Sequence, residues 1–284
     1  MKRKQSVIRQ SVISLRHRAE MPLLYLCVLI SVLVLAGSAA LVLAPDVTAT
    51  LGLGALAEDA TGIVVFAPLV PFAVILAKFY TAATARANGI KVGPEQFPEI
   101  YRQYLALAEK IGVAPVPELY VINGNGVVNA YALSCNARRN YVVLHAEIAM
   151  LNEKRPQVVD FVLAHELGHH KLHHVSLFRI LVNIIPGFMV LPQRAAIRAQ
   201  EYSADRVAMH ACGSCTESMG LLAVGPFLEH RVNIDAYARQ ADEEDKSWFV
   251  RLVHWLSDHA VNTKRLRALR LIEQHGFDRH GSMF

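Results

Sequence analysis

The stretch His165-Glu166-Leu167-Gly168-His169 places two imidazoles and one carboxylate within a single turn of an expected helix. Positions four apart on a helix of ~3.6 residues per turn lie almost above one another, so the two histidines face the same way. They can then bind one zinc ion, with Glu166 beside the remaining coordination position as a general base for a water molecule. The stretch therefore predicts a catalytic zinc site.

The residues around this motif support a buried helix and supply a third ligand. Pro156 suits a first helical turn, and residues 158–163 are almost all apolar. A catalytic zinc needs a third protein ligand, and Glu201, at the expected start of a second helix that runs to Cys212, is the best candidate. Asp205 lies four residues later on the same face, where it would orient a zinc-bound histidine. The alternative for Glu201 and Asp205 is a solvated helix face.

The two motifs together resemble a known family. A histidine motif at 165–169 followed by Glu-x-x-x-Asp at 201–205 is similar to the membrane-associated gluzincin peptidases typified by HtpX and the type I CAAX prenyl proteases. The likeness covers most of residues 95–275. It implies a zincin-type catalytic domain that binds one zinc ion and hydrolyses peptide bonds.

The resemblance also extends to weaker motifs. It implies that Asn129 and Ala130 belong to an edge strand beside the substrate cleft. It further implies that His259 acts on the oxyanion of the reaction and that Arg265 helps to hold the substrate. The chain departs from the family pattern where Ala260 replaces the usual proline after the late histidine.

A second departure concerns the membrane. HtpX-like chains usually carry a long membrane hairpin between the histidine motif and the third ligand, but only 31 residues, 170–200, intervene here. Within them, the apolar stretch 175–192 is interrupted by Arg179 and by Pro186-Gly187, and is too short for an ordinary span. It either dips into the membrane interface or packs on the domain. A turn at Pro186-Gly187 would bring Glu201 back to the zinc.

The composition predicts a membrane protein with a soluble domain. Hydrophobic residues make up 53% of the 284 residues and the mean hydropathy is +0.28, yet charged residues are concentrated outside two apolar stretches. We expect spans at about 22–45 and 60–79, because an uncharged helix of such length crosses the ~30 Å hydrocarbon layer. The alternatives are a cleaved signal peptide for the first stretch and a buried helix for the second, which contains Pro68 and Pro71.

The charge distribution predicts the orientation. Six Lys and Arg residues precede the first span, and Lys78, Arg86 and Lys91 follow the second, whereas the loop at 46–59 has none. By the positive-inside rule, both ends and the zinc site face the cytoplasm, in an inner or cytoplasmic membrane. The net charge of +5 and the pI near 9.1 fit an anionic lipid leaflet. No nucleic-acid motif accompanies this charge, so nucleic-acid binding is not expected.

The predicted fold is α+β and mostly helical, with a membrane anchor over residues 1–92 and a metallopeptidase domain with a small β-sheet over 93–284. We expect these elements: a helix at 97–111; strands at 119–122, 127–133 and 141–145; and amphipathic helices at 216–230, 246–259 and 263–275. An edge of this sheet would let an extended substrate add as a further strand. A simple core hairpin is the alternative.

The remaining histidines and cysteines give weaker signals. We expect His170, His173 and His174 on the polar face or rim of the motif helix. Cys212 and Cys215 form a lone Cys-x-x-Cys without a second pair, which argues against a zinc ribbon.

The predicted function is a membrane-anchored zinc endopeptidase that cleaves protein or peptide substrates, membrane proteins among them, in quality control or processing. The alternative is a non-catalytic zinc-binding membrane sensor or adaptor. A general base such as Glu166 argues against the alternative, since structural zinc needs none.

Overall fold

A computed structural model describes residues 12–135, 139–257 and 259–283; the basic residues at 2–9 lie outside this range. In the first half, the elements are α2 (Glu20–Leu43), α3 (Pro45–Thr50), α4 (Gly54–Phe66), α5 (Leu69–Asn88), β1 (Ile90–Lys91), α6 (Pro98–Ile111), β2 (Glu118–Ile122), β3 (Ala130–Ser134) and β4 (Asn140–His145). The second half comprises α7 (Ala146–Ala149), α8 (Pro156–Lys171), α9 (Leu177–Phe188), α10 (Leu191–Cys212), α11 (Met219–Val224), α12 (Ile234–Glu244), α13 (Trp248–Leu256) and α14 (Asn262–His275). The predicted α+β, mostly helical class is confirmed.

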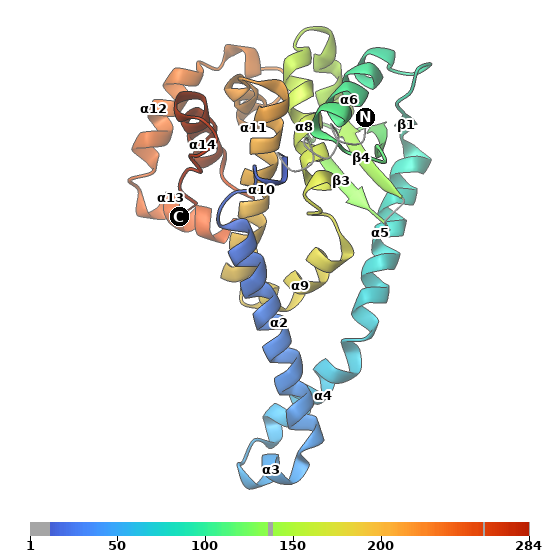
Figure 1. The fold of residues 1–284 in the computed structure, drawn as a ribbon, viewed down its shortest axis with the longest axis vertical. Helices are drawn as coiled ribbons and strands as arrows, with labels where there is room; N and C mark the ends of the chain where they lie inside the picture. Colours follow the sequence, from blue (N-terminus) through green and yellow to red (C-terminus); the bar gives the residue numbers. More distant parts are fainter. Residues whose placement is uncertain (1–11, 136–138, 258, 284) are drawn as a thin grey trace.

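Helices α2 to α5 form a stalk that extends away from the rest of the molecule, with α3 at its far end (Figure 1). Two of them, α2 with a mean hydropathy of 2.8 and α5 with 1.2, are long and apolar enough to cross a membrane. In each, only 17% of the most apolar window is buried by protein. Most residues of these windows therefore remain at least partly exposed.

The second apolar run differs from the single helix expected at 60–79. The chain bends at Ala67 and Pro68, so that α4 ends at Phe66 and α5 begins at Leu69. Proline has no amide hydrogen and is tolerated in a first helical turn, where Pro71 lies. The long helix is consequently shifted towards Asn88.

The small sheet has the strand order β1-β2-β4-β3, so β3 lies at an edge. β3 pairs antiparallel with β4, and the amides of Cys135 and His145 donate to Arg139 and Asn129 in register with this ladder. Because hydrogen-bonded pairs alternate in an antiparallel ladder, the backbone groups of residues 130, 132 and 134 point away from β4. The strand was expected to begin at residue 127, but the preceding turn is longer, since Glu147 accepts from the amides of Gly124 and Gly126.

The core lies between the sheet and helices α6, α8 and α10. Helix α8 is buried over most of its length, as expected from the apolar run after Pro156. Helix α10 crosses it closely at Gly168, where an added Cβ would meet the Cβ of Val207 at 3.2 Å and the Cα of Ala204 at 3.3 Å. Glycine is thus the residue that lets the two helices approach.

Helix α10 begins earlier than predicted. Glu201 does not open a helix but lies in the middle of one, because Pro192 starts the first turn and Gly213 ends the helix with a φ of 81°. The hairpin between α9 and α10 turns at Met189 and Val190 instead of at Pro186-Gly187. Val190 has a φ of 64°. Glu201 reaches the centre of the domain by this route.

The prediction of one helix at 216–230 is wrong. The structure has only the short α11 and two single turns of 3-10 helix there, because Gly225 adopts a φ of 78° before Pro226. The next helix, α12, was not predicted. Helices α13 and α14 occupy the last two expected positions; α13 is shorter than expected, and α14 begins one residue earlier.

The approach of α8 and α10 predicts a cost for any side chain at position 168. We expect Gly168→Val to lower the free energy of unfolding by about 1–3 kcal/mol, because the added methyl groups force the helices apart. The measurement is the thermal midpoint in detergent with the metal chelated. Gly62→Val in α4 is the matched control, since it changes the helix propensity by the same amount and an added Cβ has no neighbour within 4 Å there. An equal shift in both variants would contradict the prediction.

Candidate metal centre

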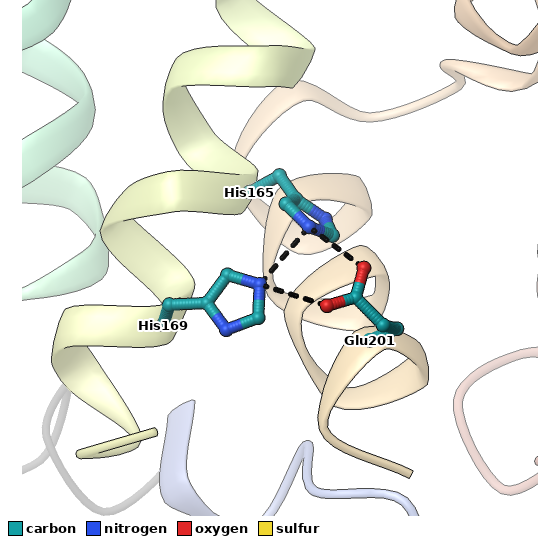
Figure 2. A group of neighbouring side chains, drawn as sticks. All are labelled: His165, His169 and Glu201. Carbon is teal, nitrogen blue, oxygen red and sulfur yellow. Dashed lines mark hydrogen bonds and ion pairs between the residues drawn. The ribbon is translucent and has the colours of Figure 1, made fainter. Parts of the chain in front are cut away.

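Three side chains from two helices converge at the centre of the domain (Figure 2). His165 and His169 come from α8, and Glu201 comes from α10. The two His Nε2 atoms lie 3.1 Å apart, and each lies 3.5 Å from an oxygen of the Glu201 carboxylate. The structure therefore brings together the three residues predicted as ligands.

These distances suit a bound metal ion. Ligand bonds of about 2.0–2.1 Å in a tetrahedral arrangement separate neighbouring donor atoms by roughly 3.3 Å. The set of two imidazole nitrogens and one carboxylate also has the chemistry that zinc prefers. The residues present thus fit the ion, and one coordination position is left for water.

The charges at the site favour a cation. Burial alone would lower the pKa of His165, but its hydrogen bonds to Asp205 and Glu201 raise that pKa to about 10. Burial keeps the pKa of His169 well below its usual value, so this imidazole is neutral and offers a lone pair. One positive charge is stabilised at this point, and a metal ion would take the place of the proton on His165.

Asp205 orients His165 from behind. The Nδ1–H of His165 donates to Asp205 Oδ1 at 2.9 Å, which leaves Nε2 facing the other ligands. Arg265 from α14 donates to both Asp205 oxygens at 2.8 and 2.6 Å. Although burial opposes ionisation, Arg265 holds the pKa of Asp205 below its usual value. The structure thus brings Arg265 to Asp205, which we did not expect from a substrate-binding residue.

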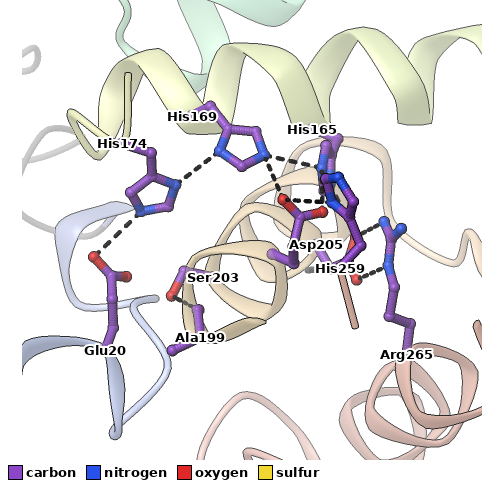
Figure 3. Close-up of polar contacts among 10 residues, drawn as sticks. Glu20, His165, His169, His174, Ala199, Ser203, Asp205, His259 and Arg265 are labelled. Carbon is purple, nitrogen blue, oxygen red and sulfur yellow. Dashed lines mark hydrogen bonds and ion pairs between the residues drawn. The ribbon is translucent and has the colours of Figure 1, made fainter. Parts of the chain in front are cut away.

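A second chain of contacts, missed at the sequence level, lies behind His169 (Figure 3). His169 Nδ1 lies 2.9 Å from His174 Nδ1, and His174 Nε2 lies 3.2 Å from a carboxylate oxygen of Glu20. Arg179 donates to the same Glu20 oxygen at 2.6 Å, and Arg16 also pairs with it. The first residue of α2 is therefore connected to the metal site.

The prediction that His170, His173 and His174 lie on a polar face or rim is wrong for two of them. His174 and His170 are buried, and His170 Nε2 hydrogen bonds the carbonyl of Tyr141 at 2.9 Å. Only His173 is exposed. The spacing of five residues between His169 and His174 was the available signal, but a turn with a left-handed His173, φ 60°, was needed to fold it back.

Glu166 lies between the ligands and the sheet. Burial, reinforced by the charge of Glu201, raises its pKa to about 7, while a hydrogen bond from the backbone of Ala132 in β3 opposes this rise. A carboxylate with a pKa near neutral pH is well suited to accept and return a proton. The edge strand and the predicted general base are therefore neighbours.

The remaining predicted residues lie on the open side of the site. Asn129 is exposed just before β3, and Ala130 is the first residue of that edge strand. His259 Nδ1 lies 3.6 Å from Glu201 Oε1, and its side chain is 76% exposed. His259 thus reaches the centre from the solvent side, whereas His174 contacts it from the buried side.

Cys212 and Cys215 lie away from the centre, at and just after the end of α10. Both are free thiols, and burial raises the pKa of each. A raised pKa lowers the fraction of reactive thiolate.

Residues 94–191 match the model of Peptidase family M48. This part of the chain is similar to the M48 peptidases. The predicted resemblance to gluzincin metallopeptidases of the HtpX and CAAX protease type is confirmed. The match supports the predicted enzyme class, a metalloprotease. The matched M48 segment contains the histidine motif and ends before Glu201.

A relative supports the same assignment. The chain is 26% identical over 188 residues to the plastoglobule-localized metallopeptidase 48 of Arabidopsis thaliana, across 58% of this chain and 53% of the relative. The chain thus spans about half the length of that relative. No solved structure matches the chain significantly.

The contact behind His169 predicts an effect on metal affinity. We expect His174→Ala to weaken zinc binding about 10–100-fold, because outer hydrogen-bond partners fix the orientation of a liganding imidazole. The measurement is a competition titration against a chromophoric zinc chelator. His173→Asn is the matched control: its side chain is exposed in the same turn, and asparagine tolerates the left-handed backbone. Equal affinities in the two variants would exclude this role for His174.

Proposed function

We propose that the protein is a membrane-anchored, zinc-dependent endopeptidase. The observation that carries the proposal is the placement of Glu166, with a pKa of about 7, next to a converging set of two imidazoles and a carboxylate. A structural metal site would need no such base. The M48 domain supports the same reaction class.

In this mechanism His165, His169 and Glu201 hold the zinc ion. When bound, zinc lowers the pKa of a water molecule and polarises the scissile carbonyl. Glu166 removes a proton from the attacking water and later returns it to the leaving amine. His259, on the exposed side of the site, donates a hydrogen bond to the carbonyl oxygen as negative charge develops there. Asp205 and Arg265 keep His165 in position.

The substrate would be an extended peptide segment. The backbone groups of residues 130, 132 and 134 point away from β4, and Ala132 already bonds the general base. A peptide paired with this edge would present a carbonyl beside Glu166. Asn129, exposed before the strand, would contact the chain bound there.

The anchor would consist of α2 and α5, with the catalytic domain in the cytoplasm. Both helices are long enough to span a bilayer and leave most of their apolar side chains uncovered. Six Lys and Arg residues precede α2, Lys78 and Arg86 lie in the second half of α5, and the loop between 46 and 59 has no Lys or Arg. A protease held at this surface is well placed for the quality control or processing of membrane proteins.

The central test is the removal of the base. We expect Glu166→Gln to lower casein cleavage by at least about 10²–10⁴-fold, because the proton transfer is lost, while zinc content stays near one per chain. The measurements are zinc analysis and cleavage by the detergent-purified proteins. In wild type, chelation should abolish cleavage and added zinc should restore it.

Two outcomes would count against the proposal. Undiminished cleavage by metal-loaded Glu166→Gln protein would exclude Glu166 as the base. Stoichiometric zinc in wild type without cleavage of casein or of membrane-protein substrates would favour the non-catalytic sensor.

The orientation has its own test. We expect a C-terminal green fluorescent protein fusion to fluoresce and a C-terminal alkaline phosphatase fusion to be inactive, because the domain faces the cytoplasm. The matched control places the same two reporters after Gly52, between α3 and α4, where the pattern should reverse. An active C-terminal phosphatase would overturn the cytoplasmic assignment.

A further inference from the structure

Helix α13 exposes an unusual amount of aromatic surface. Trp248, Phe249, Val253 and Trp255 are 61, 72, 57 and 39% exposed, and Leu256 is also exposed. The helix contains both tryptophans of the chain. Its outward face carries one charge, that of Arg251.

The helix is held firmly in this orientation. Its one buried side chain, His254, hydrogen bonds the carbonyl of Met283 at 2.6 Å. Its C-terminal carbonyls accept from two arginines of α10: Arg198 bonds Trp255 at 2.8 Å, and Arg194 bonds Leu256. These contacts satisfy carbonyls that would otherwise be unpaired at the helix end. His254 and the C-terminal carbonyls thus hold α13 against the domain, with its aromatic side chains exposed on the other side.

The same arginines fix the level of α13 relative to the stalk. They lie in the first two turns of α10, and Pro192 of that helix is contacted by Cys27 of α2, with Sγ 3.8 Å from its carbonyl oxygen. Cys27 is seven residues after Glu20, so it lies about 10 Å along α2 at ~1.5 Å per residue. Figure 1 shows α13 at the height of the upper end of α2, where the stalk meets the domain.

The hairpin between α9 and α10 exposes further apolar side chains. Phe188, Met189 and Leu191, at this turn, are 86, 57 and 52% exposed. Helix α9 contacts both α2 and α5. A second group of exposed apolar side chains thus lies next to the helix that packs on the stalk.

We propose that α13 lies in the interface of the lipid bilayer, as a third attachment of the catalytic domain beside the two spans. The inference rests on the membrane anchoring proposed above. Tryptophan and phenylalanine on one face, with an arginine among them, suit the boundary between headgroups and acyl chains of an anionic leaflet. A soluble partner would not require this face to lie level with the start of an apolar span. The attachment would fix the tilt of the domain and hence the height of the metal site above the membrane.

The two tryptophans provide the test. The full-length protein is reconstituted into phosphatidylcholine–phosphatidylglycerol vesicles, with or without bromine on the acyl chains, and tryptophan emission is recorded. We expect emission at shorter wavelength than in water, and a loss of intensity in the brominated vesicles. Trp248→Phe and Trp255→Phe, measured singly, assign the quenching to each position.

The matched control moves the reporter to the far side of the domain. Leu105→Trp, made in the Trp248→Phe/Trp255→Phe background, places an exposed tryptophan on α6, at the opposite end of the molecule from α3. Its emission should not be quenched by bromine. Quenching equal to that of α13 would show nonspecific adsorption and overturn the proposal.

Alkaline extraction of the same vesicles separates this inference from the anchor. Retained protein with quenched tryptophans supports both. Retained protein with unquenched emission at long wavelength leaves the anchor standing and overturns the role of α13. Emission at short wavelength without quenching also overturns it, because protein, such as a second copy of the chain, would then cover the face. Extracted protein with unquenched emission overturns both, and extracted protein with quenched emission keeps α13 as a peripheral attachment without the spans.

Discussion

The close crossing of helices α8 and α10 is the constraint on which the rest of the structure depends. Gly168 lies between His165 and His169, the two histidines predicted as zinc ligands. Because it has no side chain, the backbone of Ala204 can approach so closely that a Cβ at position 168 would lie 3.3 Å from the Ala204 Cα. Only at that separation can imidazoles from one helix and a carboxylate from the other share one small volume. The buried positions around this contact form the centre of the core, so metal binding and folding depend on the same packing.

The sequence predicted this centre well because the signals were local. Helical periodicity places His165 and His169 on one face, and the same period links Glu201 to Asp205. The sheet edge was predictable from turn residues and alternating apolar positions. Helix ends were less so: the early start of α10 depends on a hairpin turn at Val190, a residue type that rarely adopts a positive φ. Helix α11 ends before Gly225 and Pro226. The expected helix ran through these two residues, and their effect on it was not predicted.

What the sequence could not give was contact between distant segments. His174 was indistinguishable from its exposed neighbour His173, because burial depends on a carboxylate at Glu20, more than 150 residues away. Arg265 was predicted to contact substrate, whereas the structure pairs it with Asp205. In both cases a buried side chain pairs with a charged group from a distant segment: His174 with Glu20, and Asp205 with Arg265. The predicted ligands can therefore be read from local motifs, whereas the residues that hold them in place come from distant parts of the sequence.

The leader segment before α2 is part of that support. Val12 and Leu15 lie in the main core, and the Leu15 carbonyl accepts from Arg206 of α10 at 2.6 Å. His17 donates its amide to Ser203, and Glu20 completes the chain behind His169. Residues before the expected boundary at 92/93 thus contribute to the main core and to the contact behind His169. Deleting the chain up to residue 92 would remove these side chains together with α2 to α5.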